Sequence, residues 1–352
     1  MKFVWRDYDP ETMGYIETWL DEDAVRSTGL DDGFRDFYEY WANEDGFVVG
    51  VNFWCKIVCE NNDPVAVIAL CRHEQRTAVM ELVVDPEKRC QGIGTQLLKE
   101  LLACEEILGF TINKSEAVIF PDNAASQKAF EKAGFQYHHT DEDEYGTSMT
   151  YIFETEIDVI THYDLLIDEH NDPFYDPPEL REYMNGWDGK VFIDSLKLSP
   201  NKSVLEIGMG TGRIAVQVAP HCMHLTGIDI SPKTIERAKE NLKSHSNISF
   251  LCADFLNYDF QESFDIIYSS LTMMHFQNKG QVISKVAALL NDDGIFCLSI
   301  DRNQSEYIDM GTRRVKIYPD TLKSITALIE TSRLTVVDVF ETDNAFIVVS
   351  KK

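Results

Sequence analysis

The stretch from Val204 to Arg213 constrains the fold of this chain more than any other part of the sequence. An apolar run ending at Ile207 is long enough for a buried strand, three glycines follow at alternate positions, and helical spacing begins at Ile214. A strand, a glycine-rich turn and a helix in this order place free backbone N–H groups beside a bound ligand. The pattern predicts a site for a nucleotide-like cofactor. NAD is disfavoured, because its fingerprint requires a third glycine where Arg213 stands.

The residues around these glycines resemble a known family. Glu206 precedes them, and the pattern E-x-G-x-G-x-G is similar to motif I of class I S-adenosylmethionine (SAM) dependent methyltransferases. Further landmarks follow at the family's spacing, including an aspartate after the next strand, a segment (264–270) similar to motif IV, and a C-terminal hairpin (334–340 and 344–350). The resemblance covers residues 160–352. It implies a Rossmann-like, seven-stranded α/β domain.

The resemblance also implies which residues hold SAM. Asp229 ends the second strand, where a carboxylate can accept hydrogen bonds from both ribose hydroxyls of a nucleoside. Asp254 follows the third strand, where this family places an acid near the adenine amino group. The predicted SAM site consists of Glu206, Gly208, Met209, Gly210, Gly212, Asp229, Ile230, Asp254, Phe255 and Ser270.

The methyl acceptor would lie at the carboxyl ends of the same strands. His275 follows the fourth strand there, and a histidine can act as a base near neutral pH. The alternative is a histidine that caps the next helix or is bonded in the core. Helices expected over 179–184 and 188–196 form a lid before motif I in the family. Four aromatic residues could line an acceptor pocket or serve only in packing: Tyr163, Phe174, Tyr175 and Trp187.

The first half of the chain contains a second strand, glycine loop and helix. Helices are expected over 11–20 and 33–42, with an acidic segment between them, and the acidic stretch 141–144 is expected as a solvated hairpin tip. Three apolar runs (51–59, 65–71 and 78–84) predict an antiparallel meander. A glycine-containing loop from Arg89 to Thr95 then leads into a helix expected over 96–108. Free N–H groups at such a helix start form an anion-binding nest, and Arg89 adds positive charge. The expected ligand is a pyrophosphate.

This loop resembles the acetyl-CoA loop of the GNAT N-acetyltransferase superfamily, through Arg89-x-x-Gly92-x-Gly94. The next GNAT signature also follows in order, with a strand over 117–120, then Asn123 and a helix that ends before Gly134. The resemblance covers roughly residues 1–155 and implies a mixed, largely antiparallel sheet with helices. The implied acetyl-CoA site consists of Val83, Val84, Arg89, Gln91, Gly92, Ile93, Gly94, Thr95 and Asn123.

The acetyltransferase pattern departs from its family at one position. GNAT enzymes often carry a tyrosine seven residues after the asparagine, to protonate the leaving thiolate, and this chain has Phe130 there. A phenyl ring has no proton to give. Glu81, on the strand before the loop, is the candidate base for deprotonating an ammonium. The alternative is that Glu81 is simply an exposed acid on a strand.

The net negative charge of the chain limits which molecules it is expected to bind. The chain of 352 residues carries a net charge of −27, and residues 1–158 hold 13 basic and 32 acidic residues, a net of −19. Such a surface repels nucleic acid. Carboxylates beside a cleft hold ammonium groups, so an amine with several positive charges is one hypothesis for the acetyl acceptor. The other hypothesis is that these acidic residues only keep the domain soluble. The acids in question are Asp21, Glu22, Asp23, Asp31 and Asp32.

The length suits two domains, and we expect an acetyltransferase-like domain (1–156), a helical linker or lid (157–200) and a methyltransferase domain (201–352). No apolar run is long enough for a membrane span, the N-terminus does not resemble a signal peptide, and the eight cysteines are scattered without metal-site spacing. A cytoplasmic protein without a metal is expected.

The favoured function is a bifunctional transferase that uses acetyl-CoA and SAM on a small molecule or peptide. In two alternatives the first domain binds CoA without catalysis, or only docks the acceptor. The sequence leaves the oligomeric state open.

Overall fold

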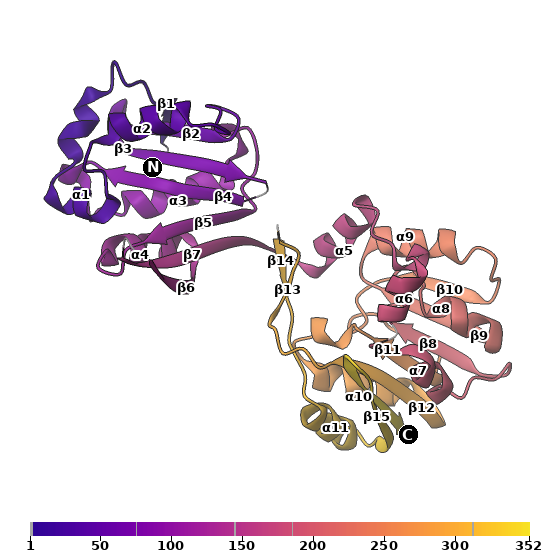
Figure 1. Ribbon diagram of the computed structural model, residues 1–352. Coiled ribbons are helices and arrows are strands. Elements are labelled where there is room, and N and C mark those ends of the chain that lie inside the picture. Colours follow the sequence, from indigo (N-terminus) through magenta and orange to yellow (C-terminus); the bar gives the residue numbers. More distant parts are fainter. Residues whose placement is uncertain (1–2, 75, 144–145, 185, 312) are drawn as a thin grey trace. The chain divides into compact units, whose positions relative to one another are not determined.

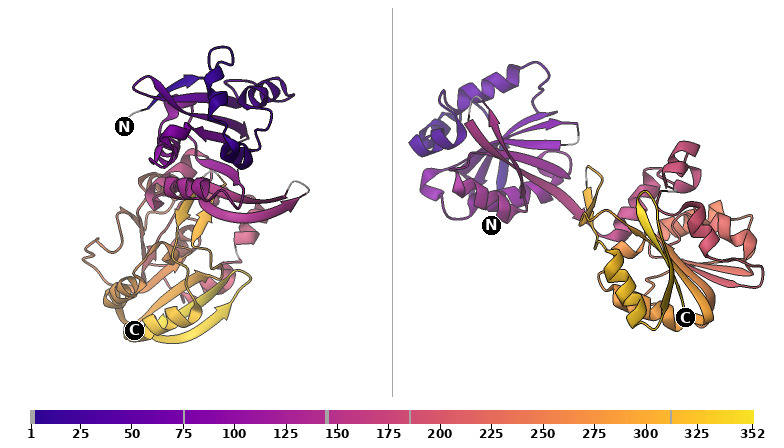
Figure 2. Two further views of the ribbon diagram at one scale, coloured as in Figure 1. Left: turned by 90° about the vertical axis from the view of Figure 1, so that its left-hand side faces the viewer. Right: turned by 60° about the horizontal axis from the view of Figure 1, so that its bottom comes forward.

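The computed structural model describes residues 3–74, 76–143, 146–184, 186–311 and 313–352. The chain divides into two compact units. The first unit consists of Met1–Glu156 with Asp309–Arg314, and the second of Ile157–Ile308 with Val315–Lys352. Both units are α/β structures built on a central sheet (Figures 1 and 2).

The first unit has a mixed, largely antiparallel sheet, which confirms the fold implied by the GNAT resemblance. Its order is β1-β2-β3-β4-β5-β7, with β6 paired to β7, and it continues through β14 and β13. The strands of this sheet are β1 (Val4–Asp7), β2 (Phe53–Glu60), β3 (Asp63–His73), β4 (Arg76–Val84), β5 (Lys114–Ile119), β6 (Gln136–Asp143), β7 (Gly146–Ile157), β13 (Tyr307–Asp309) and β14 (Arg313–Lys316). Of the last two strands, only the residues within 309–314 belong to the first unit. The helices are η1 (Gly14–Trp19), α1 (Glu22–Thr28), α2 (Phe34–Asn43), η2 (Pro86–Lys88), α3 (Ile93–Ala103), η3 (Glu105–Ile107) and α4 (Ala124–Ala133).

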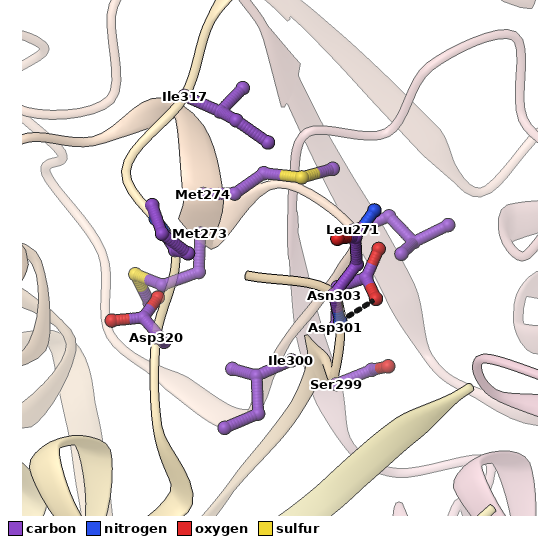
Figure 3. Close-up of a pocket in the computed structure, with 10 residues that line it drawn as sticks. Leu271, Met273, Met274, Ser299, Ile300, Asp301, Asn303, Ile317 and Asp320 are labelled. Carbon is purple, nitrogen blue, oxygen red and sulfur yellow. Dashed lines mark hydrogen bonds between the residues drawn. The ribbon is translucent and has the colours of Figure 1, made fainter. Parts of the chain in front are cut away.

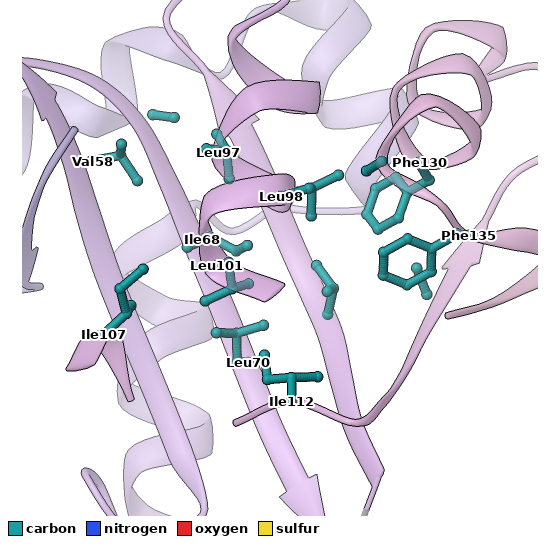
Figure 4. Close-up of a cluster of buried hydrophobic side chains, with 14 of the residues drawn as sticks. Val58, Ile68, Leu70, Leu97, Leu98, Leu101, Ile107, Ile112, Phe130 and Phe135 are labelled. Atoms are coloured by element: carbon teal, nitrogen blue, oxygen red, sulfur yellow. The ribbon is translucent and has the colours of Figure 1, made fainter. Parts of the chain in front are cut away.

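Helices cover both faces of this sheet. Leucines of α3 and the buried Phe130 of α4 pack against one face, where Phe130 and Phe135 lie side by side with ring centroids 4.9 Å apart (Figure 4). On the opposite face, η1 contributes Ile16 and Trp19 and α2 contributes Phe34. Two apolar layers therefore fix the sheet and the loop between β4 and α3.

Strand β4 separates from β5 halfway along its length. Residues 76–79 of β4 pair with β5 in parallel, whereas β4 pairs with β3 as far as Val84. A bulge at Met80 shifts the register, because Ala69 faces Glu81 and Leu70 faces Val79. The edge from Glu81 to Val84 that faces away from β3 is therefore left without a strand partner among the described residues.

The structure corrects three local expectations in this unit. The acidic segment expected between two helices is itself helix α1, which the Asp21 side chain caps by accepting a hydrogen bond from Ala24 N. The helix expected over 11–20 is only the short 3₁₀ helix η1. The acidic stretch 141–144, expected as a hairpin tip, continues β6 as far as Asp143, and Glu144 lies outside the described residues.

The second unit has a seven-stranded sheet in the order β10-β9-β8-β11-β12-β16-β15, which confirms the expected class I fold. The first five strands are parallel, and β16 is antiparallel to both of its neighbours. The strands are β8 (Ser203–Ile207), β9 (His224–Asp229), β10 (Ile248–Cys252), β11 (Phe264–Ser270), β12 (Leu290–Asp301), β15 (Thr335–Glu341) and β16 (Ala345–Lys351). The helices are α5 (Val159–Asp168), η4 (Pro173–Tyr175), α6 (Pro178–Met184), α7 (Gly189–Ser195), α8 (Ala215–Val218), η5 (Ala219–His221), α9 (Pro232–Asn241), η6 (Met273–His275), α10 (Lys279–Leu289) and α11 (Leu322–Thr331).

Helices α7, α8 and α9 pack on one face of this sheet, and α10 and α11 pack on the other. Ser231 caps α9 through a hydrogen bond from Thr234 N, and Pro232 is the first helical residue, which are the ordinary signals of a helix start. Because both faces are covered, the loops at the carboxyl ends of the parallel strands remain as the place for a ligand.

Candidate functional site

A cavity of about 540 Å³ lies at the carboxyl ends of β8, β9, β10 and β11. Helix α5 and the lid segment contribute to its wall through Val159, Tyr163, Pro173 and Met184. The predicted residues that line it are Glu206, Gly208, Met209, Gly210, Asp229, Ile230, Asp254, Phe255, Ser270 and His275. The structure therefore brings together all of the predicted SAM residues except Gly212, and adds His275 to them.

The glycine-rich loop combines one crowded position and one open position. Gly208 has a φ of +74°, and a Cβ placed there would lie 2.1 Å from Thr272 Oγ1. Gly210 has a φ of +56°, and no atom lies within 4 Å of its Cβ position. Gly212 lies outside the cavity wall, where a Cβ would meet the Leu242 side chain at 2.6 Å. Gly208 and Gly212 therefore serve close packing, whereas Gly210 borders the open space.

Asp229 joins the glycine loop to the start of α9. Its Oδ2 accepts a hydrogen bond from Gly210 N at 3.0 Å, and its Oδ1 accepts one from Ser231 N at 3.0 Å. Burial raises the pKa of this carboxyl, while the Ser231 and Gly210 N–H groups oppose the shift. Each carboxylate oxygen has a further lone pair, so the group can still accept bonds from a ligand in the cavity.

Glu206 is buried at the end of β8 and lines the same cavity. Burial raises its pKa to about 8, with the neighbouring Tyr268 and Arg213 acting in the opposite direction. Its Oε2 has no hydrogen-bond partner among the described residues. A buried carboxyl oxygen without a partner fits a ligand that carries a donor or a positive charge, and the ammonium of SAM is such a group.

Asp254 and Phe255 follow β10 in a tight turn. Asp254 Oδ1 accepts a hydrogen bond from Leu256 N at 2.8 Å, and Oδ2 accepts one from Asn257 Nδ2 at 2.7 Å. Phe255 is buried, and its ring lies 5.9 Å from that of Phe260. These contacts hold the Asp254 carboxylate in place at the cavity wall.

An ion pair that sequence reasoning missed borders the cavity. Asp188, at the start of α7, accepts hydrogen bonds from both terminal nitrogens of Arg213, at 3.1 and 2.5 Å. Ser270 Oγ donates to the same carboxylate at 2.9 Å. No local signal could have paired a lid residue with the glycine loop. The arrangement ties the lid to motif I and occupies the side chain of Ser270, which the sequence assigned to the cofactor.

Tyr163 and His275 form a second polar pair at the cavity. The Tyr163 hydroxyl lies 2.9 Å from His275 Nε2, and both residues line the cavity. Burial, together with the neighbouring His162 and Lys279, lowers the pKa of His275 to about 4. Burial raises the pKa of Tyr163, with the nearby Asp229 adding to the shift. Near neutral pH both members of the pair are therefore uncharged.

The other aromatic residues of the lid do not line this cavity. Phe174 packs against the hydrophobic core, Tyr175 is exposed, and the backbone carbonyl of Trp187 accepts a hydrogen bond from Ser299. A separate cavity of about 20 Å³ lies beside Met273, Met274 and Ile317 (Figure 3). It has room for about one water molecule, so it is too small for an acceptor.

In the first unit, the glycine loop opens the N-terminus of α3. Gly92 precedes the helix with a φ of +81°, and no side chain caps the first turn. The side chain of Ile93 is buried, so only its backbone N–H is available there. The Gln91 side chain donates to Glu87 O. Four unsatisfied N–H groups at a helix start suit an anion, as the sequence predicts for the pyrophosphate.

Arg89 has partners within the protein. Its guanidinium pairs with Asp21 Oδ2 at 2.7 Å and donates to Trp19 O at 3.0 Å, and its Nε donates to Val84 O at 3.2 Å. The predicted contact of Arg89 with the pyrophosphate therefore competes with a link between α1 and β4.

The remaining predicted CoA residues have structural contacts of their own. Asn123 caps α4 by accepting a hydrogen bond from Ser126 N at 3.1 Å, and Thr95 Oγ1 donates to Ala129 O at 3.3 Å. Val83 is buried and Val84 is partly buried, on the strand edge that β5 leaves free. That edge can pair with an extended ligand arm.

Glu81 lies on the same free edge and is partly buried. Burial raises its pKa to about 8, and no hydrogen-bond or ion-pair partner is found for it in the described part of the chain. A carboxyl in this state can take up a proton near neutral pH. Phe130, by contrast, is buried among core side chains and carries no acidic proton.

Within the described ranges, no group of three or more His, Cys, Asp or Glu side chains is arranged to bind a metal ion. None of the helices in those ranges is long and apolar enough to cross a membrane.

Part of each unit matches the model of a known family. Residues 5–135 match the model of the acetyltransferase (GNAT) family, and residues 204–294 match a methyltransferase domain model. The first match includes the Arg89 to Thr95 loop, and the second begins at the strand before the glycine turn.

Three curated relatives match the second half. Nodulation protein S of Sinorhizobium fredii is 28% identical over 114 residues, covering 31% of this chain and 53% of that protein. Malonyl-[acyl-carrier protein] O-methyltransferase of Anoxybacillus flavithermus is 36% identical and covers 27% and 37%. Ubiquinone biosynthesis O-methyltransferase of Coxiella burnetii is 33% identical and covers 33% and 51%. The chain thus spans about half or less of these relatives.

Two solved structures are also similar to this chain. N-methyltransferase NodS from Bradyrhizobium japonicum, in complex with S-adenosyl-L-homocysteine (SAH), is 23% identical with a TM-score of 0.40, covering 51% of this chain and 90% of that one. Magnesium protoporphyrin IX methyltransferase from Synechocystis is 16% identical with a TM-score of 0.45, covering 55% and 95%. On the two family matches and the two sheets, the chain joins a domain of the GNAT acetyltransferase family to a methyltransferase domain of the class I fold.

Proposed function

We propose that the second unit is a SAM-dependent methyltransferase that acts on a small molecule or a peptide. The observation that carries this proposal is the cavity at the carboxyl ends of β8 to β11. The open Gly210, Asp229 and Glu206 meet there, and Glu206 Oε2 has no hydrogen-bond partner in the described part of the chain. These groups suit the different chemical parts of one ligand. An ammonium can bind Glu206, and ribose hydroxyls can donate to Asp229.

SAM supplies an activated methyl group, so the protein has only to bind, orient and deprotonate the acceptor. Gly208 and Gly212 fix the backbone of the glycine-rich loop. Asp254 and Phe255 form the part of the cavity wall that would contact the adenine ring of SAM. His275 is the candidate proton acceptor, because burial keeps its imidazole neutral. The names of the relatives support methyl transfer and include both O- and N-methyltransferases.

The first unit has its own candidate function, acetyl transfer from acetyl-CoA to an amine. The free edge of β4 beside the uncapped start of α3 favours it, since an extended arm and a pyrophosphate would fit these two features. Glu81 would take the proton of the ammonium, through water. Because Phe130 cannot donate a proton, the alternative is a module that binds CoA, or docks the acceptor, without catalysis.

The acetyl acceptor proposed here is an amine with more than one positive charge. Glu22, Asp31 and Asp32 are exposed near α1 and α2, whereas Asp21 is held by Arg89. An acetylation screen at low and high salt tests this, with Glu22→Gln, Asp31→Asn and Asp32→Asn beside the control Glu142→Gln on β6. A preferred neutral acceptor, or rates indifferent to salt and to these variants, would refute it.

Native mass spectrometry tests the two cofactor assignments together. The full chain should bind one SAM and one acetyl-CoA, and the Asp229→Ala variant should lose only SAM. A Gly92→Val variant should lose only acetyl-CoA, because its Cβ would disturb the left-handed start of α3. Binding of acetyl-CoA without turnover of any amine would favour the non-catalytic alternative.

A further inference from the structure

We propose that the methyl acceptor is an uncharged hydroxyl compound, and that Tyr163 positions its hydroxyl and passes its proton to His275. This inference rests on the proposed methyltransferase function of the second unit and adds the chemical class of the substrate. It also gives Tyr163, which the sequence suggests only as one of four pocket aromatics, a defined role.

The charged residues of the cavity lie on the side assigned to the cofactor, and most of them are held by contacts within the protein. Arg213 is paired with Asp188, Asp229 holds the glycine loop, Asp254 holds its own turn, and Glu206 lies at the end of β8. The lining residues contributed by α5, the lid segment and the loop after His275 carry no formal charge at neutral pH: Val159, Tyr163, Pro173, Met184, Phe276, Gln277 and Asn278. These residues include neither a carboxylate for an ammonium nor a cation for a carboxylate. Asp229, which acts on Tyr163, already accepts hydrogen bonds from Gly210 N and Ser231 N.

The Tyr163 and His275 pair lies in this uncharged part. In the tautomer that carries its proton on Nδ1, His275 accepts a hydrogen bond from the Tyr163 hydroxyl at Nε2 over 2.9 Å. The Tyr163 oxygen then keeps lone pairs for the proton of an acceptor. The ionisable groups that act on His275 are His162 on α5 and Lys279 on α10, together with Tyr163 itself. Lys279 is paired with Asp320 at 3.1 Å, and the imidazole stays neutral above a pH of about 4.

The step balances with these two residues alone. A lone pair of the acceptor oxygen forms the new O–CH₃ bond, while the electron pair of the S–CH₃ bond stays on sulfur and gives a neutral thioether. The acceptor proton moves to Tyr163 as the Tyr163 proton moves to Nε2, so His275 ends as an imidazolium. A weak base is sufficient, because a hydroxyl oxygen becomes strongly acidic as it gains the methyl group.

The same base is unsuited to an amine. An alkylammonium has a pKa of about 10, and it must lose a proton before its nitrogen can attack. An imidazole with a pKa of about 4 holds that proton far too weakly. The chemistry of the pair therefore favours a hydroxyl over an ammonium.

The test uses the full chain with three probes built on the same methylphenyl ring: 4-methylphenol, 4-methylbenzylamine and 4-methylbenzoate. Methylation is followed with isotopically labelled SAM, and binding of each probe to the SAH complex is measured by calorimetry. We expect the phenol alone to bind and to be methylated. Tyr163→Phe and His275→Gln should each lower its rate by about 10²- to 10⁴-fold. SAH affinity should stay within about twofold.

Two matched variants serve as controls, Tyr175→Phe and His221→Gln, because both side chains are exposed and neither lines the cavity. A second readout is the imidazole NMR signal of His275, whose protonation midpoint should rise in Tyr163→Phe as a hydrogen bond to neutral Nε2 is lost. The inference is overturned if the amine or the carboxylate is preferred, if the phenol is not methylated by protein that binds SAM, or if Tyr163→Phe keeps the wild-type rate. Failure of the wild type to bind SAM would instead refute the proposed function.

Discussion

Asp188 and Arg213 form a two-point ion pair that connects the start of α7 to the glycine-rich loop. The Asp188 side chain is 5% exposed and that of Arg213 is 18% exposed, so the pair is largely shielded from water. Breaking a buried pair by removing one partner leaves a charge without compensation. The pair therefore couples the lid to the cofactor cavity.

Replacing Asp188 with alanine should destabilise the second unit by about 3 kcal/mol, since Arg213 is left buried without its partner and Ser270 loses its acceptor. Urea unfolding of the full chain measures this. Lys190→Ala on the same helix is the control, because its pair with Asp194 is exposed and should contribute less than about 1 kcal/mol. Equal effects of the two variants would contradict the role of the pair.

Gly208 and Gly210 should respond differently to alanine. Gly208→Ala meets Thr272 and should cost about 2 kcal/mol or more in unfolding free energy. Gly210→Ala has open space and should cost less in unfolding free energy, but Gly210 lines the cavity assigned to SAM, so an added methyl group there should weaken SAM binding. Parallel unfolding and calorimetric titrations separate the two effects. Similar profiles for both variants would argue against the assigned geometry.

SAM binding should release protons through Glu206. Its pKa in the free protein is about 8, and an ammonium bound beside it favours the ionised carboxylate. The complex then holds fewer protons than the free protein, so affinity should rise with pH up to about 8. Calorimetry in buffers of different ionisation enthalpy measures the released protons. Glu206→Gln should abolish the release, and the exposed Glu262→Gln should not; a buffer-independent enthalpy would refute the contact.

Glu81 should make the stability of the first unit depend on pH. Its folded pKa of about 8 lies above the ordinary 4.5, so the folded state binds more protons between these values. Stability from this group is therefore full below pH 4.5 and is lost as pH rises through about 8. Unfolding at pH 5 and pH 8 should show the decline in wild type and a smaller one in Glu81→Gln. Acetyl transfer, if catalysed, should fall in the same variant; an unchanged pH profile would contradict the burial argument.

Local patterns in the sequence predict those elements of the fold whose formation depends on residues adjacent in the sequence. Strands β10 and β11 and the Ser231 cap follow directly from apolar runs and capping chemistry. Helix α1 was missed although Asp21 is a capping residue followed by acids, which are the ordinary signals of a helix start. Strand β6 gives no alternating pattern, because all eight of its residues are exposed.

The residues of the candidate site likewise fall into a group that the sequence predicts and a group that it does not. The glycine loop, Asp229 and Asp254 carry recognisable spacing, and all of them line one cavity. The contacts between Asp188 and Arg213 and between Tyr163 and His275 join residues 25 and 112 positions apart, which no local period encodes. The competition for Arg89 is of the same kind, since Asp21 and Trp19 reach it only through the packing of η1 and α1 on the sheet.

Calorimetric titration of SAH into the full chain, with wild type beside Asp229→Ala, tests the central claim most directly. We predict one SAH per chain for the wild type and a loss of about 1.5–3 kcal/mol in the variant, roughly 10- to 150-fold in Kd, because two hydroxyls lose a charged acceptor. Asp259→Ala, an exposed acid outside the cavity, should bind as the wild type does. A wild type that does not bind SAH, or an Asp229→Ala variant that binds it equally well while remaining folded, would contradict the account.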